Sequence, residues 1–340
     1  MAFIKNDNNA LSTLVSTEAN FQLTWRKLSL NSACSITMTQ TKTILVAGGS
    51  GLVGRRLSEL LESRHFKVIR LSRSPSNPDK GVFHWDPSKD EIDLSAFAEA
   101  DVVINLAGES IAGALWTPWR RRKIINSRIQ STALLTKTLR EQPNKVSLVI
   151  NASATGIYGD TGDMIMNEES PVASDFLGTT CQRWEKEAMA FSDLGIRTVI
   201  YRIGIVLSEE GGMLAEIRKP MFFRVLTVFG SGNQYQSWIH IDDLCRLMVR
   251  AINYEEVRGI YNAVAPGPLT NRNMMKLIGQ IAGGFFIRIR IPSFIMRMIM
   301  GEMAKIVVSG TRVSSKKIES AGFKFTYSQA DSALRNLIGR

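Results

Sequence analysis

Residues Thr43–Gly54 read T-I-L-V-A-G-G-S-G-L-V-G, an apolar, β-branched run that breaks into four glycines and continues into a helix-forming stretch. The apolar run suits a strand that is buried on both faces of a parallel sheet. Gly48 allows a tight turn, Gly51 lets the backbone approach a pyrophosphate, and Gly54 lets the following helix pack close to the strand. The stretch therefore predicts the opening of a dinucleotide-binding βαβ unit.

A helix from Leu52 to about Ser63 is expected after this turn. Its free N–H groups would face the pyrophosphate with the positive end of the helix dipole. Two registers fit, Gly49-x-Gly51-x-x-Gly54 and Gly48-x-x-Gly51-x-x-Gly54, and an ordinary strand–turn–helix corner is the alternative interpretation. The turn residues expected to bind the cofactor are Gly48, Gly49, Ser50, Gly51, Leu52, Val53 and Gly54.

The end of the next predicted strand, Phe66–Leu71, is where an acid that holds a ribose 2′-hydroxyl usually lies. No acid is present there; the chain has Ser72-Arg73-Ser74, with Arg70 just before. A guanidinium and hydroxyls suit a 2′-phosphate, which an aspartate would repel. We therefore expect NADP(H) rather than NAD(H), with Ser72 and Arg73 on the phosphate. The alternative is that both arginines are solvated surface charges.

The chain has 340 residues, 44% of them hydrophobic, which suits one large or two modest globular domains. Its three cysteines are far apart and its histidines are isolated, so neither a disulfide framework nor a metal site is expected. The net charge of +11 comes in part from Arg120–Lys123. We interpret this positive charge as part of a binding site for an anionic cofactor or of a solvated helix face, because no nucleic-acid-binding motif is present.

The N-terminal residues 1–42 are rich in Ser and Thr, and Asp7 and Glu18 are their only acids. This composition is typical of an organelle transit peptide, and more of a plastid than of a mitochondrial one. The alternative is a disordered tail that carries no targeting signal. The expected location is the chloroplast, in the stroma or on the inner-envelope surface, with mitochondrion or cytoplasm as alternatives. The nearest stretch to a membrane span, Pro292–Val308, contains charged residues, so no span is expected, and peripheral association with a membrane stays open.

Strands and helices alternate through the middle of the chain, which predicts an α/β fold with a Rossmann-type, doubly wound parallel sheet. Looser, Gly- and Pro-rich segments beyond Gly204 predict a smaller C-terminal, substrate-side lobe. The predicted strands are Gly81–Asp86, Asp101–Leu106, Val146–Ala152 and Ile196–Tyr201, and the predicted helices are Pro118–Glu141 and Thr180–Leu194.

Small residues follow the strand Asp101–Leu106, and they would let the adenosine and ribose of a cofactor lie against the backbone. Glu109 and Arg128 could supply polar groups to the pocket or could form a structural ion pair. The residues added here to the expected cofactor site are Asn105, Leu106, Ala107, Gly108, Glu109 and Arg128.

Together these segments resemble the extended short-chain dehydrogenase/reductase superfamily, and more narrowly its atypical "epimerase family" branch, with a plant or plastid member as the nearest likeness. The resemblance covers Thr43 to Leu337 and depends on four blocks and a C-terminal tail. They are N-L-A-G-E-S-I-A-G-A-L-W-T-P-W-R-R-R-K-I-I-N-S-R-I-Q-S-T (105–132), N-A-S-A-T-G-I-Y-G-D (151–160), R-I-G-I-V-L (202–207), Q-S-W-I-H-I-D-D-L (236–244) and G-E-M-A…A-G-F-K-F (301–325).

The resemblance implies an NADP(H)-binding domain over residues 43–280, a small C-terminal domain over 281–340, and no known substrate. It also implies a catalytic tyrosine, a lysine four residues later and a Ser or Thr. The matching positions here are Leu177, Cys181 and Ala154, so the usual pair is absent. The catalytic candidates that remain are Ser153, Thr155, Tyr158 and Cys181.

Three polar residues near position 240 are interpreted as structural residues and not as catalytic ones. His240 lies in an apolar I-H-I frame and is expected to be a buried structural histidine. Asp242 and Asp243 are expected to cap the following helix.

Two functions follow from these observations. The first is an NADP(H)-dependent oxidoreductase or epimerase-like enzyme that acts on an unidentified small molecule through non-standard residues. The second is a catalytically silent NADP(H)-binding regulator or scaffold in an organelle, with a link to plastid division. The sequence does not fix the substrate or the oligomeric state.

Overall fold

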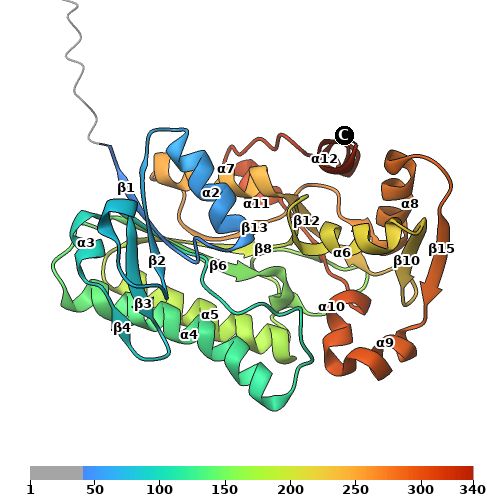
Figure 1. The fold of residues 1–340 in the computed structure, drawn as a ribbon, viewed down its shortest axis with the longest axis horizontal. Coiled ribbons are helices and arrows are strands. Elements are labelled where there is room, and N and C mark those ends of the chain that lie inside the picture. The colour runs from blue at the N-terminus through green and yellow to red at the C-terminus, as the bar shows by residue number, and fades with distance from the viewer. Residues whose placement is uncertain (1–40, 340) are drawn as a thin grey trace, which may run out of the picture. The chain divides into compact units, whose positions relative to one another are not determined.

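The centre of the fold is an eight-stranded sheet (Figure 1), seen in a computed structural model that describes residues 41–339. The transit-peptide prediction for the N-terminal segment lies, up to residue 40, outside the described residues. The strands run in the order β13-β8-β6-β5-β1-β2-β3-β4. Their bounds are β1 (Thr43–Ala47), β2 (Lys67–Ser72), β3 (Val82–Asp86), β4 (Glu91–Ile92), β5 (Val102–Asn105), β6 (Leu148–Ala154), β8 (Arg197–Ile203) and β13 (Gly259–Ala263).

Every neighbouring pair in this sheet is parallel except β3 with β4. β1 lies between β2 and β5, so the direction in which successive strands are added reverses at β1. In an open α/β sheet, ligands bind outside the carboxyl ends of the strands at this reversal. The predicted doubly wound parallel sheet is confirmed, and the strands predicted from the sequence lie within one or two residues of their observed bounds.

Helices cover both faces of the sheet because alternate residues of its strands point to opposite sides. Ile44 and Val46 of β1 pack in one core cluster with α2 (Leu52–Glu62) and α7 (Ile241–Asn253). Leu45 and Ala47 pack in the other, with α3 (Ser95–Glu99), α4 (Pro118–Glu141) and α5 (Phe176–Asp193). Figure 1 shows α2 and α7 on one side of the sheet and α4 and α5 on the other.

A smaller lobe follows β8, as predicted, and its core surrounds the fully buried Trp238. Three two-stranded sheets pair β9 with β12, β10 with β15, and β11 with β14. The elements of this lobe are β9 (Ile205–Leu207), α6 (Gly212–Met221), β10 (Val225–Phe229), β11 (Tyr235–Gln236), β12 (Trp238–His240), β14 (Leu269–Thr270), α8 (Asn271–Ala282), β15 (Ile287–Ile291) and α12 (Ala330–Ile338).

Between β15 and α12 the chain returns toward the large sheet, where β16 pairs with β7 near the N-terminal half of α5. The stretch that came nearest to a membrane span is divided here into short helices, and no described helix is long and apolar enough to cross a membrane. The remaining elements are η1 (Pro78–Lys80), η2 (Thr155–Tyr158), β7 (Ile165–Met166), α9 (Ser293–Met300), η3 (Gly301–Ala304), α10 (Lys305–Val308), β16 (Arg312–Val313) and α11 (Lys316–Ser320).

Helix α5 begins four residues earlier than its predicted start at Thr180. Asp175 caps it, since its Oδ1 accepts a hydrogen bond of 2.9 Å from the N–H of Gly178. A carboxylate at this position satisfies a backbone donor that has no partner within the helix. Gly178 lies in the first turn, and glycine is a poor helix former, so the sequence did not indicate that the helix begins at Phe176.

Candidate functional site

The glycine turn lies between the carboxyl end of β1 and the start of α2. Gly48 has φ +82°, and a Cβ there would lie 2.8 Å from the carbonyl carbon of Leu106. A Cβ on Gly54 would lie 2.3 Å from the oxygen of Gly48. These two positions require glycine, whereas a Cβ at Gly49 would meet only the Arg70 side chain, at 3.2 Å. The geometry therefore favours the Gly48-x-x-Gly51-x-x-Gly54 register.

The first turn of α2 is open to an anion. The residue that precedes it, Gly51, has no side chain to cap the helix, and the first turn contains no acid. Ser50 and Gly51 are exposed, and Leu52 and Val53 are half-buried. The unpaired N–H groups and the positive end of the helix dipole therefore lie at the carboxyl edge of the sheet, beside β5.

The two arginines at the end of β2 have different surroundings. Arg70 is engaged, since its Nη2 lies 2.5 Å from Oε1 of Glu62 and its Nε lies 3.3 Å from Oγ of Ser58. Arg73 is exposed and makes no hydrogen bond or ion pair with any residue that the structure describes. Ser72 lies at the end of β2, and its Oγ accepts a hydrogen bond from the N–H of Ser74. Arg73 is thus the arginine that is available to a ligand.

Asn105, at the end of β5, is fully buried and holds the backbone turn opposite the glycines. Its Oδ1 accepts from the N–H of Ala107, and its Nδ2 donates to Asn151 Oδ1 at 2.7 Å and to Thr132 Oγ1 at 3.0 Å. Leu106 follows, with its carbonyl group against Gly48. The side chain of Asn105 is thus engaged with structural partners and is not exposed to a ligand, which corrects its prediction as a cofactor-binding side chain.

Glu109 does not pair with Arg128, so the interpretation of these two residues as an ion pair is wrong. The Glu109 carboxylate lies 2.7 Å from Nη1 of Arg120 and 3.7 Å from Nζ of Lys123. The hydrogen bond from Arg120 lowers the pKa of Glu109, with smaller contributions from other cations that include Arg73. The ion pairs hold the loop after β5 against the start of α4.

Arg128, on α4, is a half-buried cation without a carboxylate partner among the described residues. Its Nη1 donates to the carbonyl oxygens of Glu109, at 3.0 Å, and Ile124, at 2.9 Å. Its Cζ lies 5.1 Å from the centre of the Trp184 ring and packs against Gly108. Burial lowers the pKa of the Arg128 guanidinium, and the nearby Cys181 and Glu109 partly offset this effect. A desolvated cation interacts strongly with any negative charge that enters the site.

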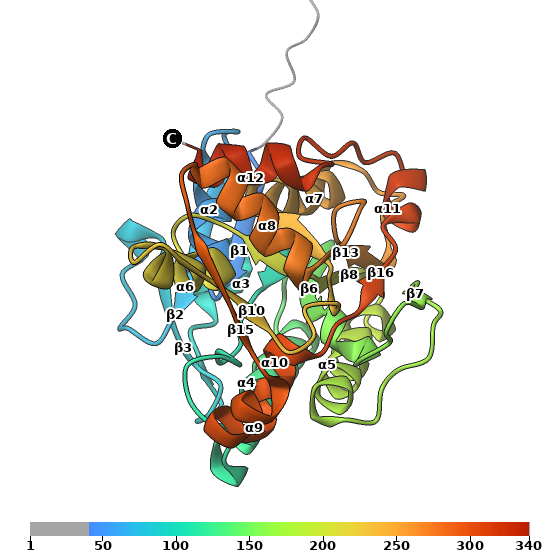
Figure 2. The ribbon, with the colours of Figure 1, turned by 90° about the vertical axis from the view of Figure 1, so that its right-hand side faces the viewer.

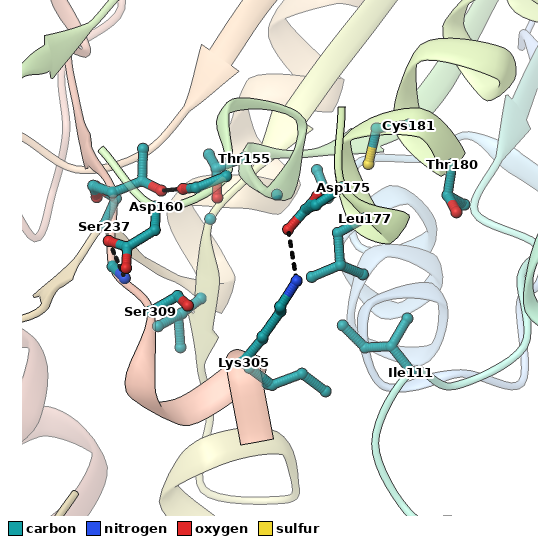
Figure 3. Close-up of a pocket in the computed structure, with 18 of the residues that line it drawn as sticks. Ile111, Thr155, Asp160, Asp175, Leu177, Thr180, Cys181, Ser237, Lys305 and Ser309 are labelled. Carbon is teal, nitrogen blue, oxygen red and sulfur yellow. Dashed lines mark hydrogen bonds and ion pairs between the residues drawn. The ribbon is translucent and has the colours of Figure 1, made fainter. Parts of the chain in front are cut away.

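A cavity of about 290 Å³ opens beside Arg128 (Figure 3). Its walls come from the carboxyl ends of β6 and β8, from the first turns of α5, and from the chain between α10 and β16. The cavity therefore lies at the carboxyl edge of the large sheet, where a ligand site is expected.

The positions that matched the family's catalytic groups all line this cavity. Leu177 and Cys181 lie one turn apart on α5, and Ala154 and Thr155 lie at the end of β6. Of the four, only Thr155 and Cys181 carry polar groups, and Figure 3 shows both at the cavity. The Thr155 hydroxyl forms no hydrogen bond with the described residues, so it is free to bind a ligand.

The Cys181 thiol is buried and protonated near neutral pH. Burial raises its pKa to about 12, although the nearby Arg128 acts in the opposite direction. A thiol becomes a good nucleophile only when its pKa is low. Cys181 therefore contributes a packed, weakly polar wall.

The other two catalytic candidates, Ser153 and Tyr158, belong to a buried polar network and do not line the cavity. Ser153 donates to Glu185 Oε1 at 2.6 Å. The Tyr158 hydroxyl donates to Asn262 Oδ1 at 2.7 Å and accepts from Arg202 Nη1 at 2.8 Å. Burial raises the pKa of Tyr158 despite its hydrogen bond from Arg202. Both hydroxyls are therefore committed to structural partners.

The C-terminal segment supplies one wall of the cavity, which was not predicted from the sequence. Figure 3 shows Lys305, on α10, reaching toward Asp175; its Nζ lies 3.9 Å from the carboxylate. The N–H of Gly310 donates to Asp160 Oδ1 at 3.3 Å, and the Thr311 hydroxyl donates to the Gly159 carbonyl. The segment carries S-G-T-R-V, residues 309–313, which lies within the C-terminal tail (301–325) of the family resemblance.

His240 is buried and structural, as predicted, but it takes the capping role expected of the two aspartates. Its Nδ1 accepts from the N–H of Asp242, and its Nε2 lies 3.3 Å from Asn336 Oδ1. Asp242 instead pairs with Arg56 at 2.6 Å. The fully buried Asp243 accepts from the N–H groups of residues 326 and 327. The prediction that the aspartates cap α7 is therefore wrong.

The part of the chain that the structure describes contains neither a candidate metal site nor a disulfide bond. No group of three or more His, Cys, Asp or Glu side chains there could hold a metal ion. Cys181 and Cys245 are free and buried.

Comparison with known proteins matches most of the chain to one family. The model for the NAD dependent epimerase/dehydratase family matches residues 44–263, and the Domain of unknown function (DUF1731) matches residues 291–337. Epimerase family protein YfhF of Bacillus subtilis is 33% identical over 298 residues, covering 87% of this chain and 97% of the relative. Epimerase family protein ML0860 of Mycobacterium leprae is 32% identical, covering 86% and 94%.

A solved structure shares both fold and sequence with this chain. The human epimerase family protein SDR39U1 (isoform2), solved with NADPH, has a TM-score of 0.79 and 28% identity, covering 87% of this chain and 99% of its own. These three relatives are bacterial and human, so they lend no support to a plant origin, a plastid transit peptide or a role in plastid division.

Proposed function

The chain belongs to the NAD dependent epimerase/dehydratase family, and from that premise we propose that it binds NADP(H) and acts as an oxidoreductase on a small molecule. One observation carries the proposal. An uncapped helix start that follows two obligatory glycines lies at the reversal of strand order, at the same carboxyl edge of the sheet as a 290 Å³ cavity. The human relative solved with NADPH supports the choice of cofactor.

The glycine turn, Gly48–Gly54, would hold the pyrophosphate through backbone N–H groups at the start of α2. Arg73 and Ser72 would hold the 2′-phosphate, because Arg73 has no other partner among the described residues and Arg70 is already paired with Glu62. The backbone of Leu106–Gly108 would support the adenosine and its ribose. The fixed loop after β5, tied down by Asn105 and Glu109, keeps this surface in place.

A bound reduced nicotinamide would supply a hydride to a substrate in the cavity. The chain's own contribution there is electrostatic, because neither Leu177 nor Cys181 is an acid/base group at neutral pH. The Thr155 hydroxyl would donate a hydrogen bond to a substrate oxygen. Arg128 would stabilise negative charge that develops near it, and its partial desolvation makes this interaction stronger than in water. Substrates whose reduction needs little proton transfer from the protein, such as quinones and α,β-unsaturated carbonyls, fit this arrangement best.

A second function has an observation in its favour. The absence of the family's tyrosine and lysine from the matching positions Leu177 and Cys181 on the described cavity wall also suits an NADP(H)-binding regulator or scaffold without turnover. The two functions share the cofactor site and differ in what the cavity does.

The test is a turnover screen on the full chain with NADPH, followed by absorbance of the reduced nicotinamide, over aldehydes, ketones, enones and quinones. The enzyme predicts turnover with at least one class, and loss of about 10²-fold or more in kcat/KM for Thr155→Val or Arg128→Met. Thr179→Val, an exposed threonine on α5, is the matched control. NADPH binding without turnover across the panel would favour the regulator, and absence of binding would contradict both.

A further inference from the structure

The surface formed by β15, α9 and the chain before β10 exposes an unusual amount of apolar area. Phe222, Phe285 and Phe294 are 84%, 80% and 67% exposed. We call this surface the α9–β15 face. Its exposed apolar residues are Phe222, Phe223, Phe285, Ile287, Ile289, Phe294, Met298 and Ile299. Figure 2 looks onto it, with β15 and α9 toward the viewer.

Two segments far apart in the sequence meet on this face. The N–H of Ile287 donates to the carbonyl of Arg224 at 2.9 Å, and Arg224 Nη1 donates to the Gly283 carbonyl at 3.2 Å. The Arg224 guanidinium also lies 5.3 Å from the centre of the Phe286 ring. These contacts bring the exposed Phe222–Phe223 pair next to the start of β15.

The β10–β15 sheet presents one of its faces to solvent. Leu226 and Val228 of β10 are buried in the lobe, so the alternate residues of β10 point outward. Ile287 and Ile289 pair with Val225 and Thr227, so they share the outward side and are about half exposed. An apolar sheet face in solvent is a feature of interaction surfaces.

Helix α9 continues the same surface after β15. Phe294 and Met298 lie one turn apart and are exposed, whereas Met296, on the opposite side, is buried. Burial of Met296 fixes the rotation of the helix. The apolar side chains of Phe294, Met298 and Ile299 therefore project away from the protein.

The charge of this face has one sign. No Asp or Glu occurs from Val257 through Gly301, or from Ile217 through Ile241. Arg224, next to the phenylalanine pair, and Arg297, on α9 between Phe294 and Met298, are exposed. Arg288 pairs with Leu226 and therefore lies on the other side of the β10–β15 sheet. A partner therefore has to offer negative charge together with an apolar layer that large aromatic side chains can enter.

We propose that the α9–β15 face docks on an anionic lipid bilayer. Exposed phenylalanines would enter the boundary between headgroups and acyl chains, and the arginines would contact anionic headgroups. A symmetric dimer through this face would oppose arginines with arginines, which is unfavourable. A nucleic acid would satisfy the charge and leave most of the aliphatic surface without a partner. The proposal does not depend on the proposed enzymatic function.

The experiment measures binding of the full chain to vesicles by sedimentation. One set is phosphatidylcholine alone, and the other contains about one third phosphatidylglycerol. Each Arg near an anionic surface is worth about fivefold in affinity. Arg297→Gln is therefore expected to weaken binding to the anionic vesicles roughly fivefold. Phe222→Ser with Phe223→Ser is expected to weaken it about tenfold or more.

The matched control is Arg64→Gln, an exposed arginine just after α2. It should bind anionic vesicles within about twofold of the unaltered chain. Circular dichroism and NADPH binding check that the variants fold. Equal binding to the two vesicle types, or an equal loss for the control, would overturn the proposal. A dimer of the unaltered chain that Phe222→Ser with Phe223→Ser converts to monomer would also overturn the proposal. So would tighter binding to an oligonucleotide than to the anionic vesicles, if the phenylalanine variant keeps that binding.

Discussion

Arg202 and Glu185 form a two-pronged ion pair in the interior, with Nε 2.8 Å from Oε1 and Nη2 2.8 Å from Oε2. The two side chains are only 5% and 8% exposed. The pair joins β8 to α5, and the same carboxylate accepts a hydrogen bond from Ser153. It therefore holds the helix that lines the cavity against the central sheet.

Removal of one partner from this pair should destabilise the protein strongly. Glu185→Gln leaves the buried Arg202 charge uncompensated, and we expect a loss of about 3–5 kcal/mol in the free energy of unfolding. Urea denaturation measures the loss. Glu141→Gln, an exposed glutamate on α4, should change stability by less than about 0.5 kcal/mol. A loss below about 1 kcal/mol for Glu185→Gln would show that the pair contributes little.

Asp175 combines a helix cap with an ion pair, and two substitutions separate these roles. Asp175→Asn keeps an oxygen that accepts from the N–H of Gly178 and removes only the long, partly exposed pair with Lys305, so we expect a loss of under about 0.5 kcal/mol. Asp175→Ala also removes the cap and should cost about 1 kcal/mol or more. Thermal unfolding of the two variants side by side checks the order. Equal losses would mean that the hydrogen bond to Gly178 is not a stabilising cap.

The close approach at Gly54 predicts a difference between two glycines of the same turn. A Cβ at Gly54 would lie 2.3 Å from the Gly48 oxygen, whereas a Cβ at Gly51 would lie 3.3 Å from that atom. Gly54→Ala should therefore displace α2, cost roughly 1–3 kcal/mol of stability and abolish binding of NADPH. Gly51→Ala should be milder in stability. Titration calorimetry and urea denaturation measure the two effects, and the reverse order would contradict the packing described for α2.

His240 should make the protein sensitive to mild acid. Burial lowers its pKa, so below the ordinary value of 6.5 the unfolded chain binds a proton more readily than the folded chain. The stability due to neutral His240 is therefore present above pH 6.5 and is lost as the pH falls toward the lowered value.

His240→Asn keeps a side-chain acceptor for α7 and removes the titrating group. The difference in unfolding free energy between pH 7.5 and pH 5.5 should shrink by about 1 kcal/mol or less in this variant. Hydrogen bonds to Ser74 and Glu91 raise the pKa of the half-buried His84, which acts in the opposite direction but is present in both proteins. Identical pH dependence for the two proteins would contradict a buried, neutral His240.

The sequence predicted the large sheet well because its strands are continuous apolar runs between clear breaks. It predicted the smaller lobe less well. β9, β11, β12 and β14 are only two or three residues long, too short for an alternating pattern, and they form by pairing with distant segments. The seventh parallel strand, β13, was missed because Gly259–Ala263 lies among loop-like sequence and pairs with β8.

The cofactor side of the site was more predictable than the cavity. Glycines and a helix start are local signals, so the turn around Gly51 could be recognised from spacing alone. The contact between Lys305 and Asp175 joins segments that are far apart in the sequence, and no local pattern marks it. Arg70 pairs with Glu62 because α2 packs beside β2, whereas Arg73 has no partner among the described residues. The sequence could not show this difference between the two arginines.

The most direct test of the central claim is a calorimetric comparison of NADPH with NADH for the full chain and for Arg73→Gln. The 2′-phosphate contact is a charge-assisted hydrogen bond worth roughly 1.5–3 kcal/mol, so the variant should lose about ten- to a hundredfold in affinity for NADPH. Its affinity for NADH, and that of Arg64→Gln for either cofactor, should stay within about twofold. No saturable binding of either cofactor to the unaltered chain, or an equal loss for both in Arg73→Gln, would contradict the account.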